Sequence, residues 1–282
     1  DVAIQRSLDG SFTYLGFQLE RPLFHDVRVR RAIAAAIDRD RILREALAGE
    51  GSIATTAVVP SSPWHHAGVP PVDHDPRAAA GLLDAAGWRP GSDGLRRDAA
   101  GRLLEFTIRT VENDPVKTAA ALHIVTDLHD LGIEARVAWH PMGELLERHA
   151  VPGDFDALLL GLTPGTDPAY LHSFYHSAMR PPGGWNLLRY ANAAVDSVLD
   201  RSQRAVDEAE RRRLVQAAQA EVSADVPHVL LFHAAAIDAA RTRLVLPPLP
   251  ATPSNRFMYL HRWALASRQV AETGDSKLIP RI

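Results

Sequence analysis

Thirteen histidines raise the question of metal binding, because a pair of imidazoles on one helix face can bind a transition metal. His172 and His176 are four residues apart, so on a helix they share one face, and Asp167 is close in the sequence. No third ligand completes a metal-binding motif, and such a pair is more often a surface or packing feature. His228 and His233 are five apart on an expected strand, so they point to opposite faces and cannot chelate one ion together. We predict no metal site and no cofactor.

The sequence contains none of the common catalytic motifs. There is no Gly-x-Ser-x-Gly, no phosphate-binding loop, no His-Glu-x-x-His and no complete Gly-x-Gly-x-x-Gly. Cysteine is absent, which excludes disulfides, thiol catalysis and cysteine-based zinc sites. No nucleophile is paired with a base, so we predict that the protein is not an enzyme.

The composition is that of a globular protein without a strongly charged partner. With 282 residues, 46% of them hydrophobic, the chain can form one large or two medium domains. The formal net charge is −3, and the arginine clusters at 28–31 and 211–213 fall within helical patterns, which favours solvated helix faces. We therefore predict no nucleic-acid partner. No segment approaches the roughly 20 apolar residues that span a bilayer, and the first residues do not form a signal peptide.

Aspartate and asparagine residues mark the starts of the predicted helices. Such a side chain accepts hydrogen bonds from the first free backbone amides, and proline fits the first helical position. Apolar residues then recur at helical spacing, as at Val29, Ile33 and Ile37. The predicted starts are Asp26, Asp38, Asp75-Pro76, Asp114-Pro115, Asn192 and Asp207.

Residues 103–162 alternate between strand and helix patterns. Strands are predicted at 104–110, 133–139 and 155–162, and helices begin at Pro115 and Pro141. This β-α-β-α-β order favours parallel strands joined by right-handed crossovers and covered on both faces. The predicted fold class is α/β. Further strands are expected at 14–19 and 228–232.

The loop after the strand at 155–162 is the strongest candidate for a binding site. Ligands of open α/β sheets collect outside the carboxyl ends of the strands, where loops expose backbone groups. This loop presents the hydroxyl of Thr163, the free amide of Gly165 and the carboxylate of Asp167. The structural alternative is that Asp167, followed by Pro168, merely caps the next helix.

Several segments together resemble one protein family. They are, in order, Pro22 to Ile33, Ile37-Asp38-Arg39, Asp75 to Ala79, Ala86-Gly87-Trp88 and Gly101 to Thr107. Their order and spacing resemble the extracellular solute-binding proteins, family 5, the peptide-binding-protein-like receptors of ATP-binding-cassette (ABC) importers. The resemblance covers residues 14 to 265, about the carboxy-terminal half of such a receptor. It implies a periplasmic-binding-protein type II-like lobe, with a mixed sheet and helices on both faces.

The resemblance also implies a domain organisation. Residues 1–13 would be an incoming hinge, 14–245 the carboxy-terminal ligand-binding lobe, 246–265 a return segment toward an amino-terminal lobe, and 266–282 a disordered tail. The amino-terminal lobe and an export signal are expected to lie outside this chain.

The implied function is that of a bacterial receptor that captures a peptide or other small solute between two lobes and presents it to a membrane permease. Such a receptor would be a monomer and would act outside the cytoplasm, as a periplasmic protein or a cell-surface lipoprotein. Two alternatives use the same fold: the sensor domain of a transcriptional regulator, and a receptor for metals or metal chelates.

The resemblance sharpens the site prediction. In many peptide-binding members this strand ends in Gly-Trp, and a loop aspartate before Asp/Glu-Pro receives the amino terminus of the peptide. Gly161 matches the glycine, Leu162 replaces the tryptophan, and Asp167-Pro168 matches the end of the motif. Pro164 or Gly165 stands where the acidic residue is expected, so the resemblance does not predict recognition of a free amino group here.

Downstream, Trp185 and Asn186 follow two glycines in a stretch that also resembles the family. An exposed tryptophan can stack on a planar group, and asparagine can both donate and accept hydrogen bonds. The alternative is that either residue closes the loop onto the core. The predicted ligand-binding residues are Leu162, Thr163, Gly165, Asp167, Trp185 and Asn186, facing one cleft, with Trp64 a weaker candidate.

Overall fold

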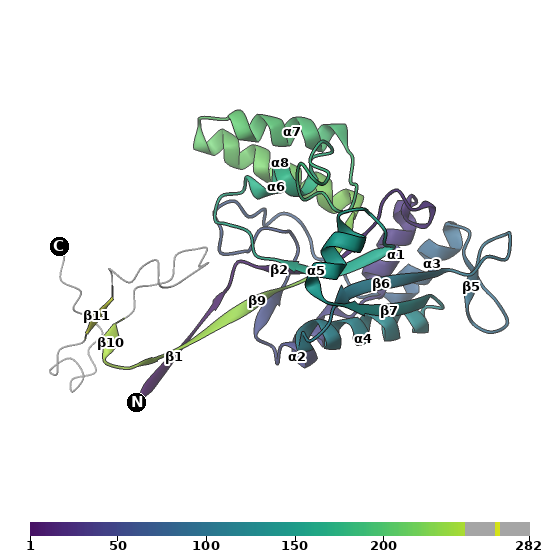
Figure 1. The fold of residues 1–282 in the computed structure, drawn as a ribbon, viewed down its shortest axis with the longest axis horizontal. Coiled ribbons are helices and arrows are strands. Elements are labelled where there is room, and N and C mark those ends of the chain that lie inside the picture. The colour runs from purple at the N-terminus through teal and green to yellow at the C-terminus, as the bar shows by residue number, and fades with distance from the viewer. Residues whose placement is uncertain (246–262, 266–282) are drawn as a thin grey trace.

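A mixed β-sheet forms the centre of the molecule (Figure 1). The computed structural model describes residues 1–245 and 263–265. The strands lie in the order β1 (Val2–Leu8), β9 (His228–Arg241), β2 (Phe12–Phe17), β8 (Ala157–Leu162), β6 (Glu105–Val111) and β7 (Glu134–His140), and β3 (Gly51–Ile53) also pairs with β9. Two small two-stranded sheets are formed by β4 (Arg89–Pro90) with β5 (Arg96–Arg97), and by β10 (Leu244–Val245) with β11 (Ala264–Leu265).

Strand directions confirm the predicted parallel core. Strand β6 is parallel to both β7 and β8, with Ile108 opposite Val137 on one side and Ala157 on the other. Strand β2 runs antiparallel to β8 and to β9, which makes the sheet mixed. The three strands expected between 103 and 162 are present, and each begins and ends within two residues of its predicted first and last residue.

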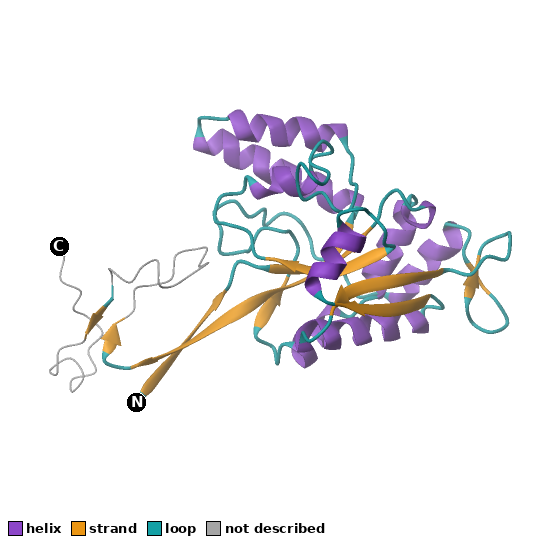
Figure 2. Ribbon diagram, in the orientation of Figure 1, coloured by secondary structure: helices purple, strands orange, loops and turns teal. Residues whose placement is uncertain are grey.

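The helices begin where the sequence predicts. They are α1 (Val27–Ala36), α2 (Arg39–Ala46), α3 (Pro76–Ala85), α4 (Pro115–Asp130), α5 (Met142–Glu144), α6 (Tyr170–Tyr175), α7 (Ala193–Arg204) and α8 (Glu208–Asp225), with a 3-10 turn η1 (Pro22–Phe24). Each predicted capping side chain accepts a hydrogen bond from a backbone amide of the first turn. Figure 2 shows how these helices flank the sheet.

The helix predicted from Pro141 differs from expectation. One short α-helical turn, α5, passes directly into a π-helix, η2 (Leu145–Ala150). The amide of Val151 donates to the carbonyl of Leu146, five residues back, at 2.9 Å. The wider turn helps to bring the ring of His149 within 4.6 Å of the ring of His140 at the end of β7.

The two faces of the sheet build two separate hydrophobic cores. On β2, Leu15 packs with helices α1 to α4 on one face, whereas Tyr14 packs with α6 to α8 on the other. On β8, Leu159 belongs to the same core as Leu15, and Leu158 belongs to the same core as Tyr14. Strand side chains alternate between faces, so both faces must be covered, as predicted. Each such buried side chain contributes about 1.5–3 kcal/mol.

Strand β9 is much longer than the strand predicted at 228–232. Its first half lies in the sheet, and residues 235–241 pair with β1 in a two-stranded ribbon that extends away from the body (Figure 1). Val2, Ile4 and Ile237 are exposed on this ribbon. Among the described residues, no helix has the length and apolar character needed to cross a bilayer. The predictions for 246–265 and 266–282 lie outside the described residues, apart from 263–265.

Candidate functional site

The loop 163–168 leaves the carboxyl end of β8, as predicted, and forms one wall of a surface recess. The opposite walls are the β1–β2 turn and the segment 58–64. The lining residues are Asp9, Gly10, Val58, Val59, Ser62, Trp64, Pro164, Gly165, Thr166, Pro168 and Tyr170. Of the six predicted ligand-binding residues, Gly165 alone lines this recess; Trp64, the weaker candidate, does so too.

Asp167 is engaged by the protein itself. Arg211 of α8 donates two hydrogen bonds to the two carboxylate oxygens, at 2.6 and 3.0 Å, and the backbone amide of Ala169 donates to Oδ1 at 2.8 Å. The hydrogen bonds from Arg211 keep the pKa of Asp167 below its usual value. The predicted alternative, that Asp167 caps the next helix, is not met, because Ala169 is the N-cap residue of α6 and Asp167 accepts from an amide that precedes the helix. Arg211 adds an ion pair across the surface.

Arg211 also contacts Trp64, which lines the recess. Its guanidinium lies 5.2 Å from the ring centre of Trp64, and Arg212 lies 5.9 Å from the same ring. A cation over an aromatic face is attracted by the ring quadrupole. One arginine thus connects the loop that contains Asp167 to the opposite wall of the recess. The arginine cluster at 211–213, predicted only as a solvated helix face, therefore also contacts the candidate site.

Three other predicted residues lie outside the lining of this recess. Trp185 is 53% exposed, and its backbone amide donates to the carbonyl of Ser173 at 3.0 Å. Leu162 ends β8 opposite Phe12 and packs partly against the second core, and Thr163 is exposed. The exposure of Trp185 leaves its ring free to contact another molecule.

Asn186 has a structural role, which corrects the prediction. The side chain is fully buried, and its amide group donates to the carbonyls of His176 and Tyr190 at 3.1 and 2.8 Å. Its oxygen accepts the backbone amide of Tyr190 at 3.0 Å. Both polar ends are therefore used to close the loop onto the core, because a buried amide must have partners. Asn186 and Trp185 do not line the recess beside loop 163–168, so the predicted shared cleft is not formed there.

His172 and His176 share a face, as predicted, and their third neighbour is Asp200 of α7. The Nε2 atoms of the two rings lie 3.3 and 3.4 Å from Oδ1 of Asp200. The backbone amide of Ala178 donates to Nδ1 of His176 at 3.0 Å, so in the neutral ring the proton sits on Nε2 and faces the carboxylate. Asp200 thus contacts both rings, and the three side chains lie close enough together to hold a metal ion. Asp167, which the sequence placed nearby, pairs elsewhere.

A second group of polar side chains joins His140, Glu144 and His149. Arg109 lies with its NH1 3.1 Å from Nε2 of His140, so a fixed positive charge adjoins this group. A neighbouring cation disfavours the binding of another one. The prediction of no metal site stays a prediction.

Comparison with known proteins finds one matching family and several related proteins. The family described as bacterial extracellular solute-binding proteins, family 5 Middle, matches residues 1–180. The chain is 27% identical over 240 residues to the oligopeptide-binding protein AppA of Bacillus subtilis, covering 83% of this chain and 43% of AppA. It is 32% identical over 213 residues to Protein XP55 of Streptomyces lividans, covering 74% of this chain and 38% of XP55.

Solved structures agree with this assignment. AppA from Bacillus subtilis in complex with a nonapeptide superposes with a TM-score of 0.80 at 25% identity, covering 94% of this chain and 53% of that one. NikZ from Campylobacter jejuni in complex with Ni(L-His) shares the fold, with a TM-score of 0.78 at 22% identity over 93% of this chain and 53% of that one. The chain thus spans about half or less of the length of these relatives. It has the predicted fold and belongs to the bacterial extracellular solute-binding proteins, family 5.

Proposed function

We propose that this chain is a ligand-binding lobe of a solute receptor that serves an ABC importer. The family membership carries this proposal, because the matched relatives include an oligopeptide-binding protein and its nonapeptide complex. The receptor would capture a peptide or small solute outside the cytoplasm, as a monomer, and present it to a membrane permease. Residues 14–245 would form the lobe. The matched proteins are binding proteins, which favours this function over the sensor domain of a regulator.

The β1–β9 ribbon supports a connection to a second lobe. It leaves the body of the sheet and exposes apolar side chains on both strands. Receptors that enclose a solute between two lobes change the angle between those lobes, and binding selects the closed state. In this proposal, residues 1–13 and the end of β9 connect the lobes.

The recess beside loop 163–168 is the proposed solute-facing surface of this lobe. It lies at the carboxyl end of β8, where backbone groups of Gly165 and Thr166 are exposed. Trp64 supplies an aromatic wall that is held by Arg211. Trp185, exposed on its own loop, would extend the contact surface from outside the recess.

The state of Asp167 bears on the class of solute. A charged amine enclosed in a receptor needs a carboxylate partner, because leaving it unpaired costs several kcal/mol. Asp167 already accepts hydrogen bonds from Arg211 and the amide of Ala169, so its negative charge is largely compensated before any amine approaches. We therefore expect the receptor not to depend on a free peptide amino terminus.

A pair of glycine substitutions tests the proposed surface. Gly165 and Gly143 are both exposed, and a Cβ at either position meets no atom within 4 Å. Gly165→Leu places a large side chain at the recess. Gly143→Leu places the same side chain on α5, at a residue that does not line the recess. In a protein of the relatives' length that contains this chain, calorimetry should show at least about tenfold weaker peptide binding for Gly165→Leu, equivalent to about 1.4 kcal/mol, and no change for Gly143→Leu. Equal binding by both variants would remove the recess from the proposal.

Acetylated peptides test the solute class separately. Amino-terminal acetylation of a bound peptide should leave its affinity within about a factor of ten, equivalent to about 1.4 kcal/mol. Tight binding of unmodified peptides that acetylation abolishes would show that a carboxylate in the receptor does receive the amine. Absence of binding to any peptide in a broad library would count against a peptide receptor.

A further inference from the structure

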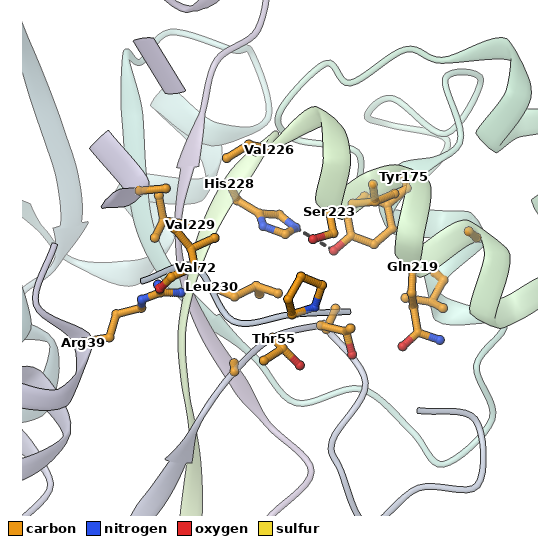
Figure 3. Close-up of a pocket in the computed structure, with 18 residues that line it drawn as sticks. Arg39, Thr55, Val72, Tyr175, Gln219, Ser223, Val226, His228, Val229 and Leu230 are labelled. Atoms are coloured by element: carbon orange, nitrogen blue, oxygen red, sulfur yellow. Dashed lines mark hydrogen bonds between the residues drawn. The ribbon is translucent and has the colours of Figure 1, made fainter. Parts of the chain in front are cut away.

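A second recess lies inside the lobe, between β9, helix α8 and the segment 54–57. Figure 3 shows its lining, with His228 on β9 facing Tyr175 and Ser223. The space open to the centre of a water-sized sphere is about 50 Å³. One buried water needs about 10–15 Å³ by this measure, so the recess exceeds the size of a single water site. It shares no lining residue with the recess beside loop 163–168.

Polar residues of the lining include Arg39, Gln219, Ser223 and His228, and the imidazole of His228 is distinguished by an unpaired nitrogen. The residue is 6% exposed, and its Nε2 lies 2.6 Å from the hydroxyl of Tyr175. Within the described part of the chain, Nδ1 of His228 has no hydrogen-bond partner. Buried polar groups are rarely left in this state, because an unsatisfied group loses its hydration without compensation. The unpaired nitrogen is therefore a specific feature that calls for an explanation.

The hydrogen-bond partners assign the tautomer of His228. The Tyr175 hydroxyl can donate or accept, and donation to Nε2 is the arrangement that gives its hydrogen an acceptor among the described contacts. When Tyr175 donates to Nε2, the neutral ring carries its proton on Nδ1. The unpaired group in the recess is then an N–H donor. A molecule that satisfies it must present an acceptor atom.

The remaining walls are mostly apolar. Ala54, Ala57, Val222 of α8 and Leu230 of β9 are among the apolar lining residues. Small side chains at two positions leave room that larger ones would fill. Strand β3 pairs with β9 only at residues 232–234, so in the described chain no strand covers this edge of β9 at 228–230. The recess thus combines a mostly apolar lining and several polar side chains with one ring nitrogen, Nδ1 of His228, that has no partner in the described chain.

We propose that this recess binds a small, mostly apolar organic molecule through a single acceptor oxygen, such as the carbonyl of a ketone, placed against Nδ1 of His228. Apolar walls and a few fixed polar groups are the usual composition of a small-molecule site. The site is independent of the proposed solute surface, so a ligand here would act in addition to a captured peptide.

Two molecules of the same shape test this assignment on the chain as it is. Cyclopentanone carries a carbonyl where methylenecyclopentane carries a CH₂ group. Proton–nitrogen spectra of protein labelled at histidine should place the His228 proton on Nδ1, and cyclopentanone should shift that resonance while methylenecyclopentane leaves it in place. We expect the ketone to bind about tenfold more tightly, since it satisfies a buried donor.

Two histidine variants provide the matched comparison. His228→Phe should abolish the preference for the ketone. His233→Phe, at a buried histidine on the same strand that does not line the recess, should retain it. If His228→Phe does not fold, the spectra of the unaltered protein decide alone. Equal binding of both molecules, binding of neither, or a proton found on Nε2 would each overturn the proposal.

Discussion

Acid should destabilise this protein through His228, and substitution of that residue measures the effect. Burial lowers the pKa of His228 from its ordinary value of 6.5 to about 4, because the charged ring loses its hydration inside the lobe. The unfolded chain therefore takes up a proton at a higher pH than the folded one. His228→Gln removes the titrating group, and its amide oxygen can still accept the Tyr175 hydroxyl.

The sign and size of the change in the free energy of unfolding with pH follow from proton linkage. Above pH 6.5 the ring is neutral in both states, and its full contribution to stability is present. Between pH 6.5 and 4 only the unfolded state binds the proton, so the free energy of unfolding falls as the pH falls. At about 1.4 kcal/mol per pH unit, the loss across this window is about 3 kcal/mol.

Urea denaturation at several pH values between 7 and 4 tests this expectation. Carboxylates also titrate toward pH 4, so the informative quantity is the difference between the unaltered protein and His228→Gln. That difference should change by about 3 kcal/mol across the window. His129→Gln, at an exposed position of α4, should follow the unaltered protein. Parallel curves for the unaltered protein and His228→Gln would refute the argument.

Other substitutions should separate structural residues from surface ones in the same denaturation assay. Asp167→Asn should lower the free energy of unfolding by less than about 1 kcal/mol, since the carboxylate is 58% exposed; a larger loss would contradict its surface character. Asn186→Ala should cost about 3 kcal/mol by orphaning buried partners, whereas Trp185→Ala should stay within about 0.5 kcal/mol; similar values for both would refute the assigned roles. Gly132→Ala should cost more than Gly101→Ala, because both have a φ near +80° but only at Gly132 would a Cβ lie 2.5 Å from another backbone atom; equal costs would show that this contact is relieved.

The helix starts were predictable because capping is local. Asp75 with Pro76 and Asp114 with Pro115 contain all of the required chemistry within four residues. Strand pairs β6–β7 and β6–β8 followed from the helices between them. The strand order around β2 and β9, by contrast, depends on contacts between residues more than 200 positions apart, which no local pattern encodes.

The candidate site was less predictable for the same reason. Asp167 pairs with Arg211, 44 residues further along, and this partner decides whether the carboxylate is free. Asn186 stands beside an exposed tryptophan, yet its side chain turns inward to Tyr190. His228 offered one usable signal, since a histidine that begins an otherwise apolar run, Val229 to Phe232, must be buried with little choice of partners.

Strand β9 runs without interruption from the central part of the sheet to the tip of the ribbon. Its fourteen residues contain no glycine and no proline, and at about 3.4 Å per residue they span about 45 Å. The register with β2 shifts between Thr13 and Tyr14, close to the point where β9 leaves the sheet. A bulge of this kind bends a strand and increases its twist. Displacement of the ribbon would therefore be transmitted along one continuous strand that is irregular only a few residues from His228.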